Sequence, residues 1–265
     1  MHKGSRIALV PQKERRLALA AFGVIAVLFA AATFHTRYQP FEFLVSMENF
    51  WLFIFQDLLP PKIADWGTIL EGVVQTVSMA VSASLIAGIL SLVLAFLGAN
   101  TTSPWKPLKK LIRLLASLGR NIPSMIWTFL LIMAFGIGTV VGVLALLITT
   151  CGFLTRSFME IIDEVGGESL EAMDAVGAGR LTTITQVIMP ASLPGFISWL
   201  LYSLEVNIRS STLVGAVGGG GIGLIMMGYI KQFRYHSAMG VILLVAAIVI
   251  LVDMLTNFLR KKVLA

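Results

Sequence analysis

Long hydrophobic runs without charge alternate with short charged segments along the whole chain. Uncharged runs cover residues 17–34, 72–100 and 121–155, and two later apolar stretches cover about 191–213 and 237–258. A hydrocarbon core of about 30 Å requires roughly 20 apolar residues in a helix. The pattern therefore predicts an all-α, polytopic membrane protein.

The run from 121 to 155 is too long for one membrane helix. At about 1.5 Å per residue it would extend roughly 50 Å. The sequence Phe135-Gly136-Ile137-Gly138 is the natural place for a break. This gives six predicted transmembrane helices, of which the third is short.

We expect two regions, 1–67 and 68–265. The first holds an N-terminal tail, the first membrane helix and an external segment rich in aromatic residues, where a helix lies at the membrane interface. A cleaved signal peptide is the alternative for the first run, but its apolar stretch is long and more spans follow. The second region holds a core of five membrane helices, with residues 101–120 and 160–190 as polar loops on one side.

Composition agrees with a membrane protein and sets its orientation. Hydrophobic residues make up 57% and charged residues 13%, against about 25% charged in a soluble domain. With six spans, 15 of the 20 Lys and Arg residues fall on the side that holds both termini and the 160–190 loop. Basic residues mark the cytoplasmic side, so both termini and this loop are predicted to be cytoplasmic in a bacterial inner membrane. A single cysteine, Cys151, excludes an internal disulfide.

The 160–190 loop predicts two short helices joined by glycines. Ser169 is an expected helix cap, with Glu171 and Asp174 in the first turns. Gly177 and Gly179 follow and favour a turn. A second amphipathic helix carries Leu181, Ile184 and Ile188 on one face, and Pro190 and Pro194 are expected to end it.

No catalytic set or phosphate-binding loop is readable. The three histidines lie in different segments, and no Gly-Lys-Ser/Thr sequence exists. The chain is therefore not expected to be an enzyme or to bind a metal. The glycine run follows a membrane helix, so it predicts a hinge or gate, or a close-packed turn, and not a dinucleotide loop. Its residues are Gly218, Gly219, Gly220, Gly221 and Gly223.

Polar residues within the fifth span are the strongest candidates for a translocation pathway. Glu205 and Arg209 are four residues apart and can pair along one helix face. Charges within a span face protein or water, so the pair either fixes packing or places Arg209 in the path of an anion, with Asn207 nearby. For Arg120, at the start of the third span, the favoured role is to anchor the helix at the membrane surface, whereas Asn121 could face a pore.

The polar loop resembles the cytoplasmic coupling loop of bacterial ABC-importer permeases. The matching positions are Glu171, Ala172, Gly177 and Pro190, and Met173, Val187 and Met189 depart from the family pattern. The resemblance implies that this loop, including Asp174, docks onto a separate ATP-binding subunit. ATP and Mg²⁺ would then be bound by that partner, with no cofactor in this chain.

Four further stretches resemble the permeases of phosphonate ABC importers, at 120–127, 152–162, 205–223 and 233–245. This implies a type I importer fold, a second permease subunit that is identical or related, two ATP-binding subunits and an extracytoplasmic solute-binding protein. The implied ligand is a phosphonate or a related phosphorus oxyanion such as phosphite. The alternative is a stand-alone secondary transporter or channel for a small anion, but no inverted repeat is evident.

Overall fold

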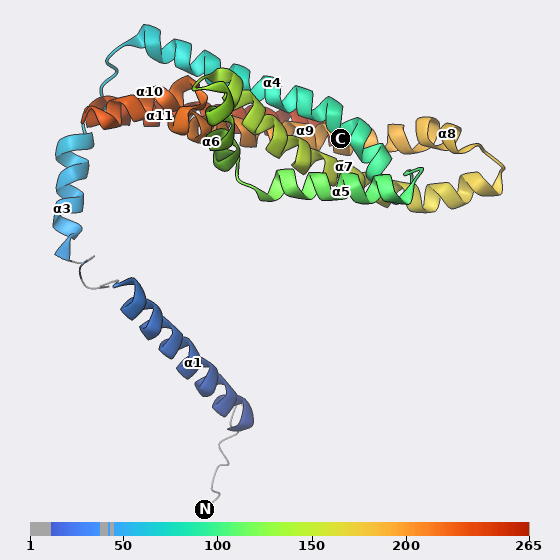
Figure 1. Ribbon diagram of the computed structural model, residues 1–265, viewed down its shortest axis with the longest axis horizontal. Coiled ribbons are helices and arrows are strands. Elements are labelled where there is room, and N and C mark those ends of the chain that lie inside the picture. The colour runs from blue at the N-terminus through green and yellow to red at the C-terminus, as the bar shows by residue number, and fades with distance from the viewer. Residues whose placement is uncertain (1–11, 38–41, 43–44, 265) are drawn as a thin grey trace, which may run out of the picture. The chain divides into compact units, whose positions relative to one another are not determined.

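The computed structural model describes residues 12–37, 42 and 45–264, and every regular element in these ranges is a helix (Figure 1). The chain divides into two units, Met1–Asp57 and Leu58–Ala265. The helical content agrees with the all-α class that the hydrophobic runs predict.

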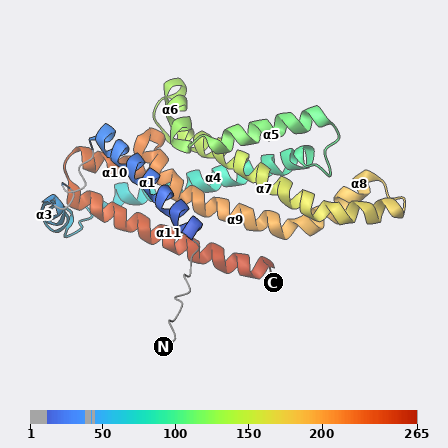
Figure 2. The same ribbon diagram turned by 90° about the horizontal axis from the view of Figure 1, so that it is seen from below.

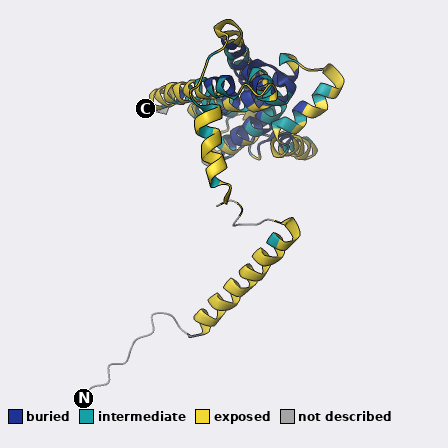
Figure 3. Cartoon of the chain, turned by 90° about the vertical axis from the view of Figure 1, so that its left-hand side faces the viewer, coloured by how far each residue is buried: buried dark blue, intermediate teal, exposed yellow. Residues whose placement is uncertain are grey.

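The first unit contains helix α1, Gln12–Thr36, followed by α3, Met47–Leu52. Nearly all of α1 is exposed (Figure 3), and its apolar stretch is long enough to cross a membrane. An exposed and uniformly apolar helix of this length suits a lipid environment. A π-helical turn, η1, covers Phe53–Leu58, and Trp51 stacks on Phe55 with ring centroids 5.8 Å apart.

The second unit is a helix bundle in which α4, α5, α7, α9 and α11 run side by side (Figures 1 and 2). Its core joins small residues of α4, such as Ala87 and Ala95, to larger ones of α7 and α9, such as Leu154 and Phe196. The helices are α4 Trp66–Gly98, α5 Lys106–Asn121, α6 Ser124–Phe135, α7 Thr139–Ala175, α9 Met189–Val214, α10 Gly221–Lys231 and α11 Tyr235–Leu264.

Five helices of the described chain are long and apolar enough to span a membrane, or six if α5 and α6 count as one span bent by 94°. The predicted break is confirmed, because α6 ends at Phe135 and Gly136 has a φ of 76°. The expectation of a loop over residues 101–120 is wrong for most of that segment. Ile112, Ala116 and Gly119 form a buried stripe at helical spacing, and this stripe packs α5 into the bundle despite its lysines.

The two short helices expected in the polar loop are also corrected. Helix α7 continues to Ala175, so Ser169 lies inside it and does not cap a new helix. The earlier glycines of this segment do not end the helix, since a glycine within a helix costs only about 1 kcal/mol. The helix ends where Gly177 takes a φ of 75°, and its N–H donates to the Asp174 carbonyl while that of Ala178 donates to Met173. These two bonds make a Schellman motif.

Pro190 and Pro194 do not end the following helix. The short α8, Arg180–Thr183, passes through a π-helical turn, η2, Ile184–Ile188, directly into α9, and Pro194 lies inside α9. A proline removes one backbone hydrogen bond, and packing against neighbouring helices compensates for this within membrane bundles. The result is one hairpin, α7–Gly177–α8, which extends beyond the other helices at one end of the bundle (Figures 1 and 2).

Candidate functional site

A cavity of about 220 Å³ lies between α5, α6, α7 and α9. This is more than ten times the volume of about 10–15 Å³ that one water molecule requires. Polar side chains from all four helices reach it: Arg120, Ser124, Thr149, Thr150, Tyr202, Ser203, Asn207 and Ser210, together with Leu146, Phe153 and Val206.

Asn207 is the predicted pathway residue that the structure places on this cavity. Ser203, Asn207 and Ser210 follow one another at i, i+4 and i+7, so they share one face of α9. Asn207 is buried, and its Oδ1 accepts from Thr150 Oγ1 at 2.9 Å while its Nδ2 donates to Ser84 Oγ at 2.9 Å. The amide thereby joins α4, α7 and α9, and it holds this polar face in position.

The Glu205–Arg209 pair lies outside the cavity lining. The predicted pairing is confirmed, with Arg209 Nη2 3.3 Å from Glu205 Oε1. The Arg209 side chain is 59% exposed and that of Glu205 is 12% exposed. Asn121 is exposed and donates to Ser117 Oγ at 3.1 Å, also outside the lining. Whether Arg209, Glu205 or Asn121 contacts a solute stays a prediction.

Arg120 lines the cavity, although the sequence interpretation favoured a surface anchor for this residue. It lies near the end of α5. At a rise of about 1.5 Å per residue, about 21 Å of helix separates it from Lys106, the first residue of α5. A signal was present, since Ser203, Asn207 and Ser210 form a polar stripe in a hydrophobic helix. The sequence could not show which residue of α5 faces that stripe.

The glycine run is a close-packed turn. A Cβ at Gly223 would lie 2.0 Å from the Thr212 carbonyl oxygen, and one at Gly219 would lie 2.5 Å from Val214 Cγ1. Gly218, Gly220 and Gly221 take positive φ angles. The N–H of Ile222 donates to Thr76 Oγ1 at 2.8 Å, and that of Gly138 donates to the Gly218 carbonyl at 3.0 Å. The role of this run as a gate stays a prediction.

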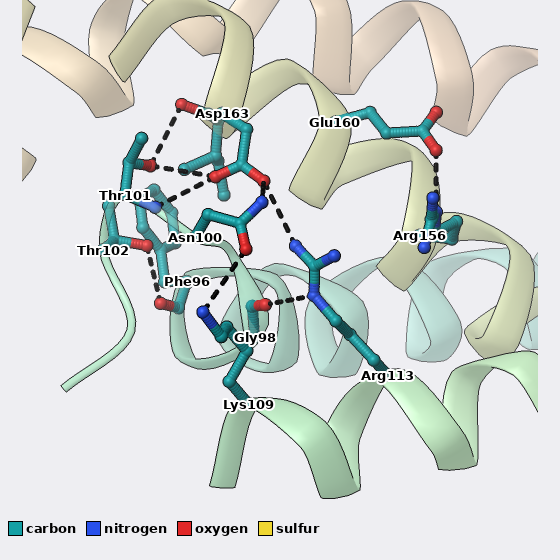
Figure 4. A network of polar contacts seen from close by, with 11 residues as sticks. Phe96, Gly98, Asn100, Thr101, Thr102, Lys109, Arg113, Arg156, Glu160 and Asp163 are labelled. Atoms are coloured by element: carbon teal, nitrogen blue, oxygen red, sulfur yellow. Dashed lines mark hydrogen bonds and ion pairs between the residues drawn. The ribbon is translucent and has the colours of Figure 1, made fainter. Parts of the chain in front are cut away.

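A polar network holds the turn between α4 and α5 against α7 (Figure 4). Asp163 of α7 accepts from Asn100 Nδ2 at 2.7 Å, from the Thr101 amide at 3.0 Å and from Arg113 Nη2 at 3.2 Å. Arg180 of α8 donates to the Ser103 carbonyl at 2.9 Å. This turn therefore connects the base of the hairpin with α5.

The hairpin tip exposes apolar side chains. Val176 and Leu181 are each 75% exposed, and Asp174 and Pro190 are also exposed. Ile188, which was predicted on the same face as Leu181, is instead fully buried. Glu171 and Ala172 belong to α7, but their side chains lie outside the described residues.

In the described part of the chain, no group of three or more His, Cys, Asp or Glu residues is placed to hold a metal ion.

Proteins similar to this chain in sequence are transport permeases. The chain is 32% identical to the phosphite transport system permease protein PtxC of Stutzerimonas stutzeri over 205 residues. This match covers 77% of this chain and 74% of the relative. It is 29% identical to the phosphate-import permease protein PhnE of Mycolicibacterium smegmatis, over 80% of this chain and 40% of that longer relative.

Among solved structures, the chain resembles a chain of the MetNI methionine ABC transporter in an inward-facing conformation. The TM-score is 0.62 at 23% identity, over 74% of this chain and 96% of the other. The fold is therefore that of a type I ABC importer permease, as the resemblance implied. The model of the family "binding-protein-dependent transport system inner membrane component" matches residues 87–264. This match covers more than half of the sequence, and the chain therefore belongs to that family of multi-pass inner-membrane transport proteins.

Proposed function

We propose that this permease forms the translocation pathway of an ATP-driven importer for a small phosphorus oxyanion. Residues 68–265 form the permease core, and the pathway opens alternately to the two sides of the membrane. ATP and Mg²⁺ are bound by a separate subunit.

The observation that carries this proposal is the exposed α7–α8 hairpin. Val176 and Leu181 present large apolar side chains to solvent at its tip, and exposed apolar groups that project from a bundle are typical of a protein contact. The hairpin contains Glu171, Ala172, Asp174 and Gly177, the positions that resemble the coupling loop. A stand-alone transporter or channel has no need for such a projection.

The ligand class is supported by two independent observations. The relatives named above are permeases for phosphite and phosphate. Of the described residues that line the cavity, one is charged, and that residue is the cation Arg120. A guanidinium group matches the geometry of phosphorus oxyanions with paired hydrogen bonds.

The proposed assembly contains two permease subunits, two ATP-binding subunits and one extracytoplasmic solute-binding protein. Both termini and the hairpin are cytoplasmic, because that side holds most of the Lys and Arg residues. Each hairpin docks onto one ATP-binding subunit, and closure of the ATPase pair moves α7 and α9.

Cysteine cross-linking tests this arrangement. In a background with Cys151→Ala, Val176→Cys and Leu181→Cys should each cross-link to the ATP-binding subunit, with a yield that changes when ATP is added. Ile137→Cys is the matched control, because Ile137 is 69% exposed in the turn at the other end of α7. Equal cross-linking from all three positions would contradict the docking proposal.

Transport assays separate the importer from a stand-alone carrier. Proteoliposomes with the permease, the ATP-binding subunit and the binding protein should accumulate phosphite, phosphate or methylphosphonate only with ATP on the hairpin side. Uptake by the permease alone, without ATP, would instead support the secondary transporter or channel.

A further inference from the structure

We propose that Arg120 is the anion-binding residue of an oxyanion subsite in the cavity between α5, α6, α7 and α9. The subsite takes a small phosphorus oxyanion during its passage through the membrane. The inference rests on the proposed function, since it names the residue within that pathway that recognises the solute. It was Arg209, and not Arg120, that the sequence favoured for this role.

The backbone of Arg120 packs against the uncharged part of α7. Gly119 of α5 packs on Gly152 of α7, and a Cβ at Gly152 would lie 2.7 Å from the Arg120 amide nitrogen. Gly152 lies near the end of the uncharged run 121–155, one helical turn before Arg156, within the candidate span Thr139–Gly167. Arg120 is therefore about one helical turn inside the level of the exposed Arg156–Glu160 pair, in the part of the span that leads to the hairpin. Ionisable residues within a span face protein or a water-filled cavity and commonly mark solute pathways.

The charge of Arg120 is not compensated within the described residues. Arg120 is an exposed residue that lines the cavity, and its side chain makes no hydrogen bond or ion pair to another described residue. Three other arginines of the bundle each pair with a carboxylate: Arg113 with Asp163 at 3.2 Å, Arg156 with Glu160 at 2.7 Å and Arg209 with Glu205 at 3.3 Å. A paired arginine attracts an anion more weakly than an unpaired one, because the carboxylate cancels most of its field. Arg120 is accordingly the stronger anion receptor.

Hydroxyl groups that line the same cavity as Arg120 can complete the coordination of an oxyanion. Across the described residues, the side-chain oxygens of Ser124, Tyr202 and Ser210 form no hydrogen bond to protein. Each can donate to a phosphorus-bound oxygen. Asn207 is held by Thr150 and Ser84, so it orients the α9 face and leaves one amide N–H free. No carboxylate is found among the lining residues, and the site therefore favours an anion over a cation.

The test compares variants of the full transporter, with its ATP-binding subunit and binding protein, in proteoliposomes. Uptake of phosphite, phosphate and methylphosphonate is measured, with basal ATPase activity and subunit assembly as separate readouts. Arg120→Gln should lower uptake about 10- to 100-fold, because a hydrogen bond between charged groups is lost. Arg120→Lys should retain more uptake than Arg120→Gln, because it keeps the charge but loses the paired geometry. Tyr202→Phe should lower uptake roughly 2- to 10-fold.

The matched control is Lys110→Gln, which removes another exposed cation of the same helix, one that does not line the cavity. It should leave uptake and assembly unchanged. Arg209→Gln provides the direct comparison between the two arginines, and its loss of uptake should be smaller than that of Arg120→Gln.

Failure of this inference can be told apart from failure of the proposed function. If the wild-type transporter moves none of the three oxyanions, the proposed ligand class is wrong. If it moves them and Arg120→Gln is as active as Lys110→Gln, Arg120 is not the receptor while the function stands. If Arg120→Gln fails to assemble, Arg120→Lys and Tyr202→Phe decide the matter, and full uptake by both would overturn the inference.

Discussion

The glycine turn at the hairpin tip and the glycine run between α9 and α10 use the same residue for different physical reasons. At Gly177 no atom lies within 4 Å of the position of an added Cβ, but φ is 75°. In the run from Gly215 to Gly223, an added Cβ would contact backbone or side-chain atoms of α4, α7 and α9. Gly177 is required by its backbone conformation alone, whereas the run is required by the space around it and, at Gly218, Gly220 and Gly221, by positive φ angles as well.

This difference separates a contact surface from a packed joint. The hairpin tip is open to a partner, and a change there should impair coupling before it impairs folding. The glycine run lies where three helices meet, and a change there should impair folding first. The following predictions test this separation, from the largest expected effect to the smallest.

Gly223→Ala should have the largest effect on stability. The new methyl group would lie 2.0 Å from the Thr212 carbonyl oxygen and 2.7 Å from the Ala216 nitrogen. Overpacking of this kind costs on the order of 3 kcal/mol or more. Thermal unfolding of the detergent-solubilised protein should shift to lower temperature, or the protein should fail to accumulate. Gly228→Ala is the control, because nothing lies within 4 Å of that position in α10.

Thr76→Val should destabilise the same joint by about 1–3 kcal/mol, the cost of an unpaired buried N–H. The hydroxyl of buried Thr76 accepts from the Ile222 amide at 2.8 Å, and valine has nearly the same shape without that acceptor. The melting temperature should decrease, with transport retained below it. An unchanged melting temperature would mean that the start of α10 finds another acceptor.

Gly177→Ala should reduce stability by only about 1–2 kcal/mol, the cost of a left-handed conformation for a residue with a Cβ. Its main effect should be on coupling, because the α7–α8 turn changes its direction. Transport per ATP hydrolysed should decrease in proteoliposomes while assembly persists. Gly167→Ala is the matched control, since Gly167 lies inside α7 with open space around it. Equal coupling in both variants would show that the geometry of the turn does not matter.

The smallest effect is expected at the exposed N-terminus of α4, the helix that supplies Thr76 to the packed joint. The Thr68 hydroxyl, then the amides of Thr68 and Gly67, donate to Asp65 and lower the pKa of its carboxyl below 3.8. Because the folded-state pKa is lowered, this contribution to stability is complete well above the unfolded-state pKa of 3.8 and is lost as pH falls through the folded-state pKa. Asp65→Ala should slightly lower the melting temperature at pH 7. The difference from the wild type should disappear at the lowest pH at which the protein remains soluble.

Several local features of the sequence predicted local structure correctly, although the expected cap at Ser169 was wrong. The apolar runs predicted the long helices, Gly136 marked a break, and the spacing of Glu205 and Arg209 predicted their ion pair. Errors occurred where neighbouring helices decided the outcome. Helix α5 was missed because its lysines obscured a buried stripe of three small or apolar residues. The continuation of α8 through Pro190 into α9 was missed because packing compensates for a lost hydrogen bond.

The sequence alone determined that this chain crosses the membrane several times and carries a polar hairpin between two apolar halves. Both follow from interactions within one helix or from transfer of apolar residues out of water, and neither depends on which helices become neighbours. Only the tertiary structure decided that Arg120, and not Arg209, lines the cavity. That outcome depends on the glycine contact between α5 and α7 and on the face that α9 turns inward, and these are relations between residues that lie far apart in the sequence.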